Sequence, residues 1–200
     1  ATVDVIHNGN ITATNGIGIV AMGIGNGGND VSARSNGYID ATDSPFGIGI
    51  LAGSIGEDGK VSATVTDVDA SLAGVIAFNP DGDASAHGRG DINLTGDISL
   101  VGVGAFAQNG DARASLGRNG SIEADGLGIA GLAAVSVGGR AIVSNRGDIS
   151  DVLVGAVGVS LGDGDVIVSN RGSIEAGLVG MAGFNYGNGD VRLINRGDVS

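Results

Sequence analysis

Aspartate residues in four glycine-rich turns are the side chains of this sequence best suited to binding an ion. The turns read Pro80-Asp81-Gly82-Asp83, Asn109-Gly110-Asp111, Gly162-Asp163-Gly164-Asp165 and Asn188-Gly189-Asp190. Carboxylate oxygens are preferred ligands of Ca²⁺, which makes Asp81, Asp83, Asp163 and Asp165 candidate calcium ligands. Calcium-binding Gly/Asp turns recur every nine residues, however, and these turns recur about every 25. Because aspartate also favours turns through hydrogen bonds to its own backbone, the sequence predicts no cofactor and leaves calcium as the alternative.

Acid–base catalysis would require histidines or paired carboxylates gathered around a cleft. His7 and His87 are far apart in the repeat and share no acidic partner, so both are predicted to be surface turn residues. Asp67 and Asp69 form a carboxylate pair of the kind glycosidases use, but their positions fit an outward-facing column of a repeat. No insertion is long enough to wall a deep cleft. We therefore expect no catalytic residues and no enzymatic activity.

Three Arg-Gly-Asp tripeptides match the sequence associated with integrin binding. They are Arg89-Gly90-Asp91, Arg146-Gly147-Asp148 and Arg196-Gly197-Asp198. The same position of the repeat also holds Arg171-Gly172-Ser173. Turn geometry therefore explains the tripeptides without a receptor.

A short repeat, in which an Ile or Val follows a glycine by two residues, must position all of these side chains. The repeat is clearest at Asn145-Arg146-Gly147-Asp148-Ile149, which returns 25 residues later from Asn170 and again from Asn195. Its anchors are Gly9, Gly37, Thr66, Gly90, Gly120, Gly147, Gly172 and Gly197, spaced by 28, 29, 24, 30, 27, 25 and 25 residues. Such a period is typical of a solenoid.

Each repeat contains three short runs that read as β-strands. In one unit, 165–170 is rich in β-branched residues, 173–176 alternates polar and apolar residues, and 178–184 forms a third extended run. Glycine at this density disfavours helices, at about 1 kcal/mol per helical position. The sequence predicts an all-β parallel β-helix of about eight coils, with 24–30 residues and three short strands per coil.

Aligned columns indicate which side chains face the interior. Two residues after each anchor stand Ile11, Ile39, Val68, Ile92, Ile122, Ile149, Ile174 and Val199, a predicted inward stack. A second column, predicted to share its parity, reads Ala13, Ala41, Ala70, Leu94, Ala124, Asp151 and Ala176. A bulky third-strand stack is predicted from Met22, Leu51, Phe78, Phe106, Leu132, Val159 and Phe184. Asn145, Asn170 and Asn195 are predicted to form an internal amide ladder.

Outward columns are predicted to be of two kinds. One face carries acidic and hydroxyl side chains beside Arg89, Arg146, Arg171 and Arg196, which we expect to form salt bridges between coils. The third strand is apolar at both parities, so it should leave an apolar strip outside. Its interface candidates are Val103, Ala105, Ile129 and Met181.

Composition limits the partner classes. The chain has 200 residues, 40 of them glycine, with no cysteine and a net charge of −12. This charge argues against nucleic acid as a partner, which requires a basic surface. No apolar run is long enough to span a membrane as a helix, so we expect no direct membrane insertion. Neither end carries a recognisable capping repeat, so residues 1–200 are expected to be one β-helix fragment of a longer repeat protein.

The repeat resembles the passenger regions of bacterial autotransporter-type and adhesin surface proteins. Asn8-Gly9-Asn10-Ile11-Thr12-Ala13, leading into Gly16-Ile17-Gly18-Ile19-Val20-Ala21, carries the resemblance, which extends along the whole chain. The resemblance implies a right-handed β-helix, exported to the cell surface of a Gram-negative bacterium and associated with its outer membrane.

The function expected from this resemblance is that of a non-enzymatic structural or adhesive rod. Its partner would be a host-cell, matrix or neighbouring bacterial surface component. The alternative is a self-assembling surface layer or fibre that packs through the apolar third-strand face.

Overall fold

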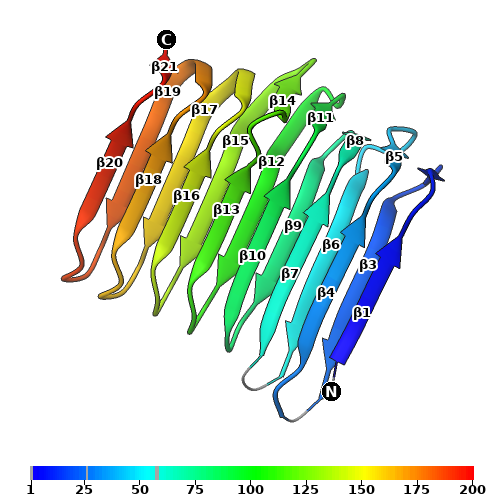
Figure 1. Cartoon of the computed structure of the whole chain (residues 1–200), viewed down its shortest axis with the longest axis horizontal. Helices are drawn as coiled ribbons and strands as arrows, with labels where there is room; N and C mark the ends of the chain where they lie inside the picture. The colour runs from blue at the N-terminus through cyan, green and yellow to red at the C-terminus, as the bar shows by residue number, and fades with distance from the viewer. Residues whose placement is uncertain (1, 26, 57–58) are drawn as a thin grey trace.

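The chain forms a β-solenoid. A computed structural model describes residues 2–25, 27–56 and 59–200, which form strands and turns and no helix. Figure 1 shows the coils stacked one after another along the long axis of the molecule, with the two termini at opposite ends. Among the described residues, no helix is long and apolar enough to cross a membrane.

The strands fall into three sets according to their place in each coil. The first strands are β1 (Thr2–His7), β4 (Asp30–Ser35), β7 (Lys60–Val65), β10 (Asp83–Gly88), β13 (Ala112–Leu116), β16 (Ala141–Asn145), β18 (Val166–Asn170) and β20 (Val191–Asn195). The second strands are β2 (Ile11–Thr12), β5 (Tyr38–Ala41), β8 (Asp67–Ala70), β11 (Asp91–Leu94), β14 (Ser121–Ala124) and β21 (Asp198–Val199). The third strands are β3 (Ile17–Ile24), β6 (Ile48–Ile55), β9 (Ala73–Asn79), β12 (Ile98–Ala107) and β15 (Leu127–Ser136). Second and third strands are continuous in β17 (Asp148–Ser160) and β19 (Ser173–Asn185).

Every strand pairs in parallel with the equivalent strand of the next coil. The first strands make an eight-stranded sheet, ordered from β1 to β20. The second and third strands belong to one larger sheet because β17 joins both sets. The strands complete about seven turns. The parallel β-helix predicted from the sequence is confirmed, with one turn fewer than expected because β20 and β21 are not followed by a third strand.

The corner between second and third strands differs from coil to coil. In β17 the chain crosses it without a break, through Asp151 at a φ of 56°. Asp151 is exposed, and the neighbouring Val152 is buried and pairs with Ala176 of the next coil across a register shift. The prediction that Asp151 continues the inward alanine column is therefore wrong, because this bulge puts Val152 in its place.

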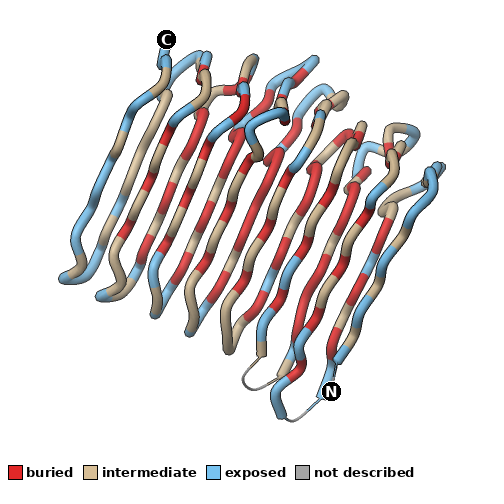
Figure 2. The backbone as a smooth tube through the Cα atoms, viewed as in Figure 1, coloured by how far each residue is buried: buried red, intermediate tan, exposed pale blue. Residues whose placement is uncertain are grey.

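The predicted isoleucine and valine stack is confirmed residue by residue. The register pairs each member with the next, from Ile11 with Ile39 through to Ile174 with Val199. The six members from Ile39 to Ile174, both included, are almost completely buried. Figure 2 shows buried positions alternating with more exposed ones along the strands. Burying one such side chain contributes about 1.5–3 kcal/mol, so this stack is a main source of stability.

The asparagine ladder is also confirmed. Asn145 donates from Nδ2 to Oδ1 of Asn170 at 2.9 Å, and Asn170 donates to Asn195 at 3.0 Å. Asn145 and Asn170 are fully buried, and their Oδ1 atoms accept from the amides of Gly147 and Gly172. The ladder therefore satisfies the buried side-chain amides of Asn145 and Asn170 at the first corner.

A column of glycines makes room for the isoleucine stack. A Cβ added at Gly131 would lie 2.6 Å from Cγ2 of Ile149 and 2.7 Å from the carbonyl oxygen of Gly155. The equivalent glycines, which meet the β-branched methyl groups of the next coil, are Gly18, Gly49, Gly74, Gly102, Gly131, Gly155 and Gly180. These glycines lie in the third-strand segments, so the third strand approaches the second-strand stack more closely than any side chain would allow.

The third strand bends at this glycine. In coil four, Val101 pairs with Ala73 and Val103 with Val75, while Gly102 is left out of the ladder. A Cβ on Gly102 would point at Ile122, and the next residue, Val103, is also fully buried in the core. Two successive residues therefore face the interior, and the inside–outside alternation changes phase after the glycine.

Candidate functional site

The third strands carry a continuous apolar surface on the outside of the solenoid. The register aligns Phe78, Phe106 and Val135 in one column, which Val159 and Phe184 extend. Phe78 is 41% exposed and Phe184 is 50% exposed. We call this surface the apolar face; its outward residues are Val20, Met22, Ile24, Leu51, Ile55, Ile76, Phe78, Phe106, Ala133, Val135, Val137, Val157, Val159, Leu161, Ala182, Phe184 and Tyr186.

An open hollow of about 330 Å³ lies in the middle of the apolar face. Its lining consists of Phe78, Phe106, Ala107, Gln108, Val135 and Val137. Among the described residues, Gln108 is the only polar member of this lining, and none of them contributes a charged side chain to it. The hollow therefore offers apolar and aromatic contact and no acid–base chemistry.

Because the third strand bends at its glycine, the residues that form this surface differ from those predicted. Val103 and Ala105, predicted as interface residues, are fully buried, and Met181 packs against the core. Of the four interface candidates only Ile129 is exposed, at 39%. The outward strip exists, but it is formed by residues of the opposite parity.

The predicted bulky inward stack is wrong for the same reason. Counting by two from Gly102 places Phe106 inside, but the extra inward residue at Val103 turns Phe106 outward. Of that predicted stack only Leu132 is fully buried. Most of the phenylalanines are therefore surface residues of the apolar face and do not fill the core.

The four candidate calcium ligands are engaged in hydrogen bonds between coils. Asp81 accepts from Asn109 Nδ2 at 2.8 Å, and Asp83 accepts from the amide of Asp111 at 2.9 Å. Asp163 accepts from the amide and side chain of Asn188, and Asp165 from the amide of Asp190. Within residues 2–25, 27–56 and 59–200, no three acidic, histidine or cysteine side chains gather as a metal site. The turns thus use their aspartates to join one coil to the next.

The candidate acid–base residues are likewise occupied by neighbours. Asp69 accepts from the hydroxyl of Tyr38 at 2.6 Å and from Asn93 Nδ2 at 2.7 Å. The hydrogen bond to Asp69, together with burial, raises the pKa of Tyr38 above its ordinary value. Asp67 accepts from the amide of Asp91 at 3.0 Å. This carboxylate pair therefore serves the outward columns as hydrogen-bond acceptors.

The histidines lie on strands and not in turns. His87 is half-buried on the outer face of β10, with Nδ1 2.9 Å from Oγ of Ser115. Burial lowers the pKa of His87, and the positive charges of Arg89 and Arg146 lower it further, although the contact with Ser115 opposes them. His7 ends β1, and its Nε2 is buried without a hydrogen-bond partner among the described residues. Neither histidine is hydrogen-bonded to a carboxylate of the described chain, as a catalytic base would require.

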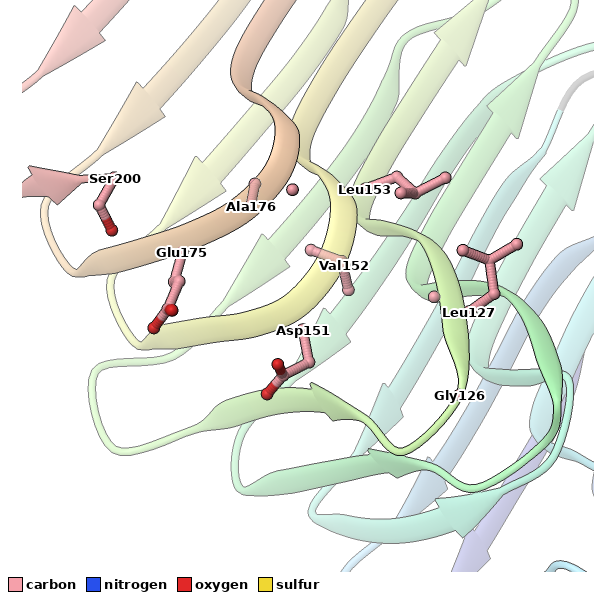
Figure 3. Close-up of a pocket in the computed structure, with 10 residues that line it drawn as sticks. Gly126, Leu127, Asp151, Val152, Leu153, Glu175, Ala176 and Ser200 are labelled. Carbon is pink, nitrogen blue, oxygen red and sulfur yellow. The ribbon is translucent and has the colours of Figure 1, made fainter.

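A second hollow, of about 430 Å³, lies at the corner between the second and third strands. There the segment that joins β14 to β15 projects beyond the more direct connections within β17 and β19. Figure 3 shows Leu127 and Leu153 on one side of it and the carboxylates of Asp151 and Glu175 on another. Asp151 and Glu175 come from successive coils. The hollow follows from the difference in connection length between coils, and no described histidine or arginine lines it.

The arginines beside the acidic columns do not form the expected salt bridges. Within the described chain, ion pairs join Arg113 to Asp83 and Asp111, and Arg140 to Asp111. Burial of Asp111 opposes its ionisation, but the hydrogen bonds and charges of Arg140 and Arg113 outweigh burial and lower the pKa of Asp111. These pairs lie at the start of the first strands, at the opposite end from Arg146 and Arg171. The predicted pairing is therefore wrong in its location.

No family model matches the chain, and no curated protein or solved structure matches it either.

Proposed function

We propose that this chain is a non-enzymatic structural rod that adheres to other surfaces through its apolar face. The continuous outward column of apolar side chains on the third strands is the observation that carries the proposal. Contiguous exposed apolar surface of this kind marks contact sites in soluble proteins. Each coil hydrogen-bonds to the next through both sheets, which suits a rigid support.

The rest of the surface supports the proposal that the rod adheres through the apolar face alone. The outward second-strand columns carry acidic and hydroxyl groups, and the net charge of −12 keeps most of the surface hydrated. Adhesion would then be confined to the apolar face. We propose a host-cell, matrix or neighbouring bacterial surface component as the partner, with no role for nucleic acid.

The resemblance of the repeat to passenger regions supports export to the surface of a Gram-negative bacterium. The absence of cysteine is compatible with that location, since stability then comes from strand pairing and packing. The segment itself would remain outside the membrane, in association with the outer surface.

Display of the chain on a Gram-negative bacterium that does not adhere by itself tests this proposal. Adherence to cultured epithelial cells, matrix-coated wells and polystyrene should rise on display. It should return toward baseline when Phe78→Ser and Val137→Ser are introduced, because both residues line the central hollow. Phe46→Ser is the matched control, since Phe46 is 70% exposed but lies outside the apolar face. Unchanged adherence of the Phe78 and Val137 variant would contradict the proposal.

Self-assembly through the same face is the second candidate function. The observation that favours it is the repetition of apolar columns in register over successive coils, which allows two copies to pack face to face. Light scattering should then show mass increasing with concentration in the parent and not in the Phe78→Ser, Val137→Ser variant. A monodisperse monomer at the highest attainable concentration would exclude assembly and leave the adhesive rod standing.

A further inference from the structure

A column of arginines runs along the corner between the first and second strands of the later coils. Arg146, Arg171 and Arg196 hold the same place in successive coils, as their amides show by donating to Leu116, Asn145 and Asn170 of the preceding coil. Neighbouring parallel strands are about 4.8 Å apart. Arg118, from the coil before Arg146, adds a fourth guanidinium beside this column. All four side chains are exposed.

These guanidiniums have no counter-ion within 4 Å among the described residues. The ion pairs of the described chain involve Arg113 and Arg140, and none of the four corner arginines makes a side-chain hydrogen bond to a described residue. Two unit charges about 5 Å apart in water repel by roughly 0.8 kcal/mol. An external anion placed between them would remove this repulsion.

Arg118, Arg146 and Arg171 line a hollow of about 290 Å³, and no other described residue contributes to its lining. The hollow is smaller than most sites for drug-sized ligands. Its walls offer planar N–H donors, which bind the oxygens of sulfate and phosphate groups in pairs. The hollow therefore suits one small, highly charged group.

Arg89 and Arg146 add positive charge around His87, which lies near this corner. Beyond burial, the charges of Arg89 and Arg146 contribute to lowering the pKa of His87. Another hollow, which shares Arg146 with the hollow lined by the three arginines, is also lined by His87. His87 thus lies close enough to report the charge state of the corner.

We propose that Arg118, Arg146 and Arg171 form a binding site for a single tetrahedral oxyanion group, a sulfate or a phosphate. Two acidic side chains of the adjoining second strands border the arginine column: Asp148, two residues after Arg146, and Asp198, two residues after Arg196. They would repel a broad polyanion such as duplex nucleic acid, so the site selects an isolated charged group. This inference is independent of the adhesive function of the apolar face.

Titration of the intact chain at constant ionic strength tests the site. Sodium sulfate and sodium phosphate are added separately, with chloride making up the ionic strength. N-acetylglucosamine 6-sulfate and unmodified N-acetylglucosamine follow as a further pair. Saturable binding of the free ions and of the sulfated sugar, but not of the unmodified sugar, is expected. Binding of the sulfated sugar more tightly than free sulfate would identify a sugar ester as the source of the group, and the reverse order would identify the free ion.

Charge-neutral variants separate this site from general attraction to positive charge. Arg146→Gln and Arg171→Gln should each weaken sulfate binding about tenfold, the change expected for loss of one paired charge-assisted contact. Arg192→Gln is the matched control. Arg192 is exposed on β20, makes no side-chain hydrogen bond or ion pair with a described residue, and is not in the lining of the hollow. The affinity of Arg192→Gln for sulfate should change by less than about twofold, well below the tenfold change expected for the loss of one such contact.

The His87 ring supplies an independent readout. Sulfate should raise the pKa of His87, measured by NMR, because the bound anion offsets the charge of Arg146. In Arg146→Gln the same rise should require about tenfold more sulfate. Absence of saturable binding, equal weakening by Arg192→Gln, or binding with no response at His87 would each overturn the proposal. Thermal melting of each variant checks that the fold is intact.

Discussion

At the scale of single residues, the buried polar groups depend on hydrogen bonds between coils, and Asn170 shows this most clearly. Its Nδ2 donates to the carbonyl oxygens of Gly172 and Asp198 and to Asn195 Oδ1. Asn170→Asp would replace this donor with an acceptor that faces these three acceptors in a fully buried position. Leaving buried polar groups unpaired costs about 1–3 kcal/mol each. Urea unfolding should therefore show a loss of about 2–4 kcal/mol.

Asn195→Asp is the control for this prediction. Asn195 uses Oδ1 to accept from Asn170 and from the amide of Gly197, and it is exposed. A carboxylate keeps both of these acceptor roles, so the free energy of unfolding should change by less than about 1 kcal/mol. Equal destabilisation by the two substitutions would show that the direction of the ladder is unimportant.

His87 makes the stability of the fold depend on pH near neutrality. Its pKa is lowered in the folded chain, mainly by burial, so below about pH 6.5 the unfolded chain binds more protons than the folded one. Stability should therefore fall as the pH drops through the unfolded pKa toward the folded one. His87→Gln should flatten the melting temperature between about pH 7 and pH 5. A variant with the same slope as the parent would contradict this assignment.

At the scale of the strand, glycine sets how closely the third strand approaches the second. Gly131→Ala would place a methyl group within 2.6 Å of Ile149 Cγ2 and 2.7 Å of a backbone oxygen. Overpacking of this kind costs about 1–3 kcal/mol. The backbone oxygen cannot move aside as a flexible side chain would, so we expect the upper part of this range in urea unfolding.

Gly177→Ala provides the comparison within a third-strand segment. A Cβ there meets no atom closer than 3.8 Å, which is ordinary van der Waals contact. The substitution should be neutral or slightly stabilising, since alanine restricts the unfolded chain more than glycine does. A similar loss of stability at both positions would refute the role assigned to the glycine column.

The bend of the third strand at the glycine column is a feature that the sequence does not predict. The Ile149 stack and the Asn145 ladder follow from the period, because equivalent residues of parallel coils must be neighbours. The third strand contains apolar residues at both parities, so alternation alone leaves its inward set open. The choice is made by the close contact of Gly102 with Ile122, a contact between different coils that no local pattern records. The apolar strip was therefore predictable in kind, but Val103 and Ala105 were assigned to the wrong side.

At the scale of the molecule, opposite charges and apolar surface occupy different edges of the solenoid. Acidic columns follow the second strands, the corner arginines border them, and the apolar face covers the third strands. One repeat therefore supplies three separate chemical surfaces. Substitutions on one surface should leave the other two unaffected, since sites without shared contacts act nearly independently.

Because each coil contacts mainly its neighbours, stability should vary along the axis. β10 and β13 lie in the middle of the eight-stranded sheet, whereas β1 and β20 form its edges. In β20 the inward residues Val191 and Leu193 are 44% and 51% exposed. In a stacked repeat, outer units open without disturbing the centre. Amide hydrogen exchange of the 200-residue chain should therefore be slowest in β10 and β13 and become faster toward both ends. Uniform exchange in all coils would show instead that the solenoid opens only as a single cooperative unit, with coupling between coils stronger than the contacts of each coil suggest.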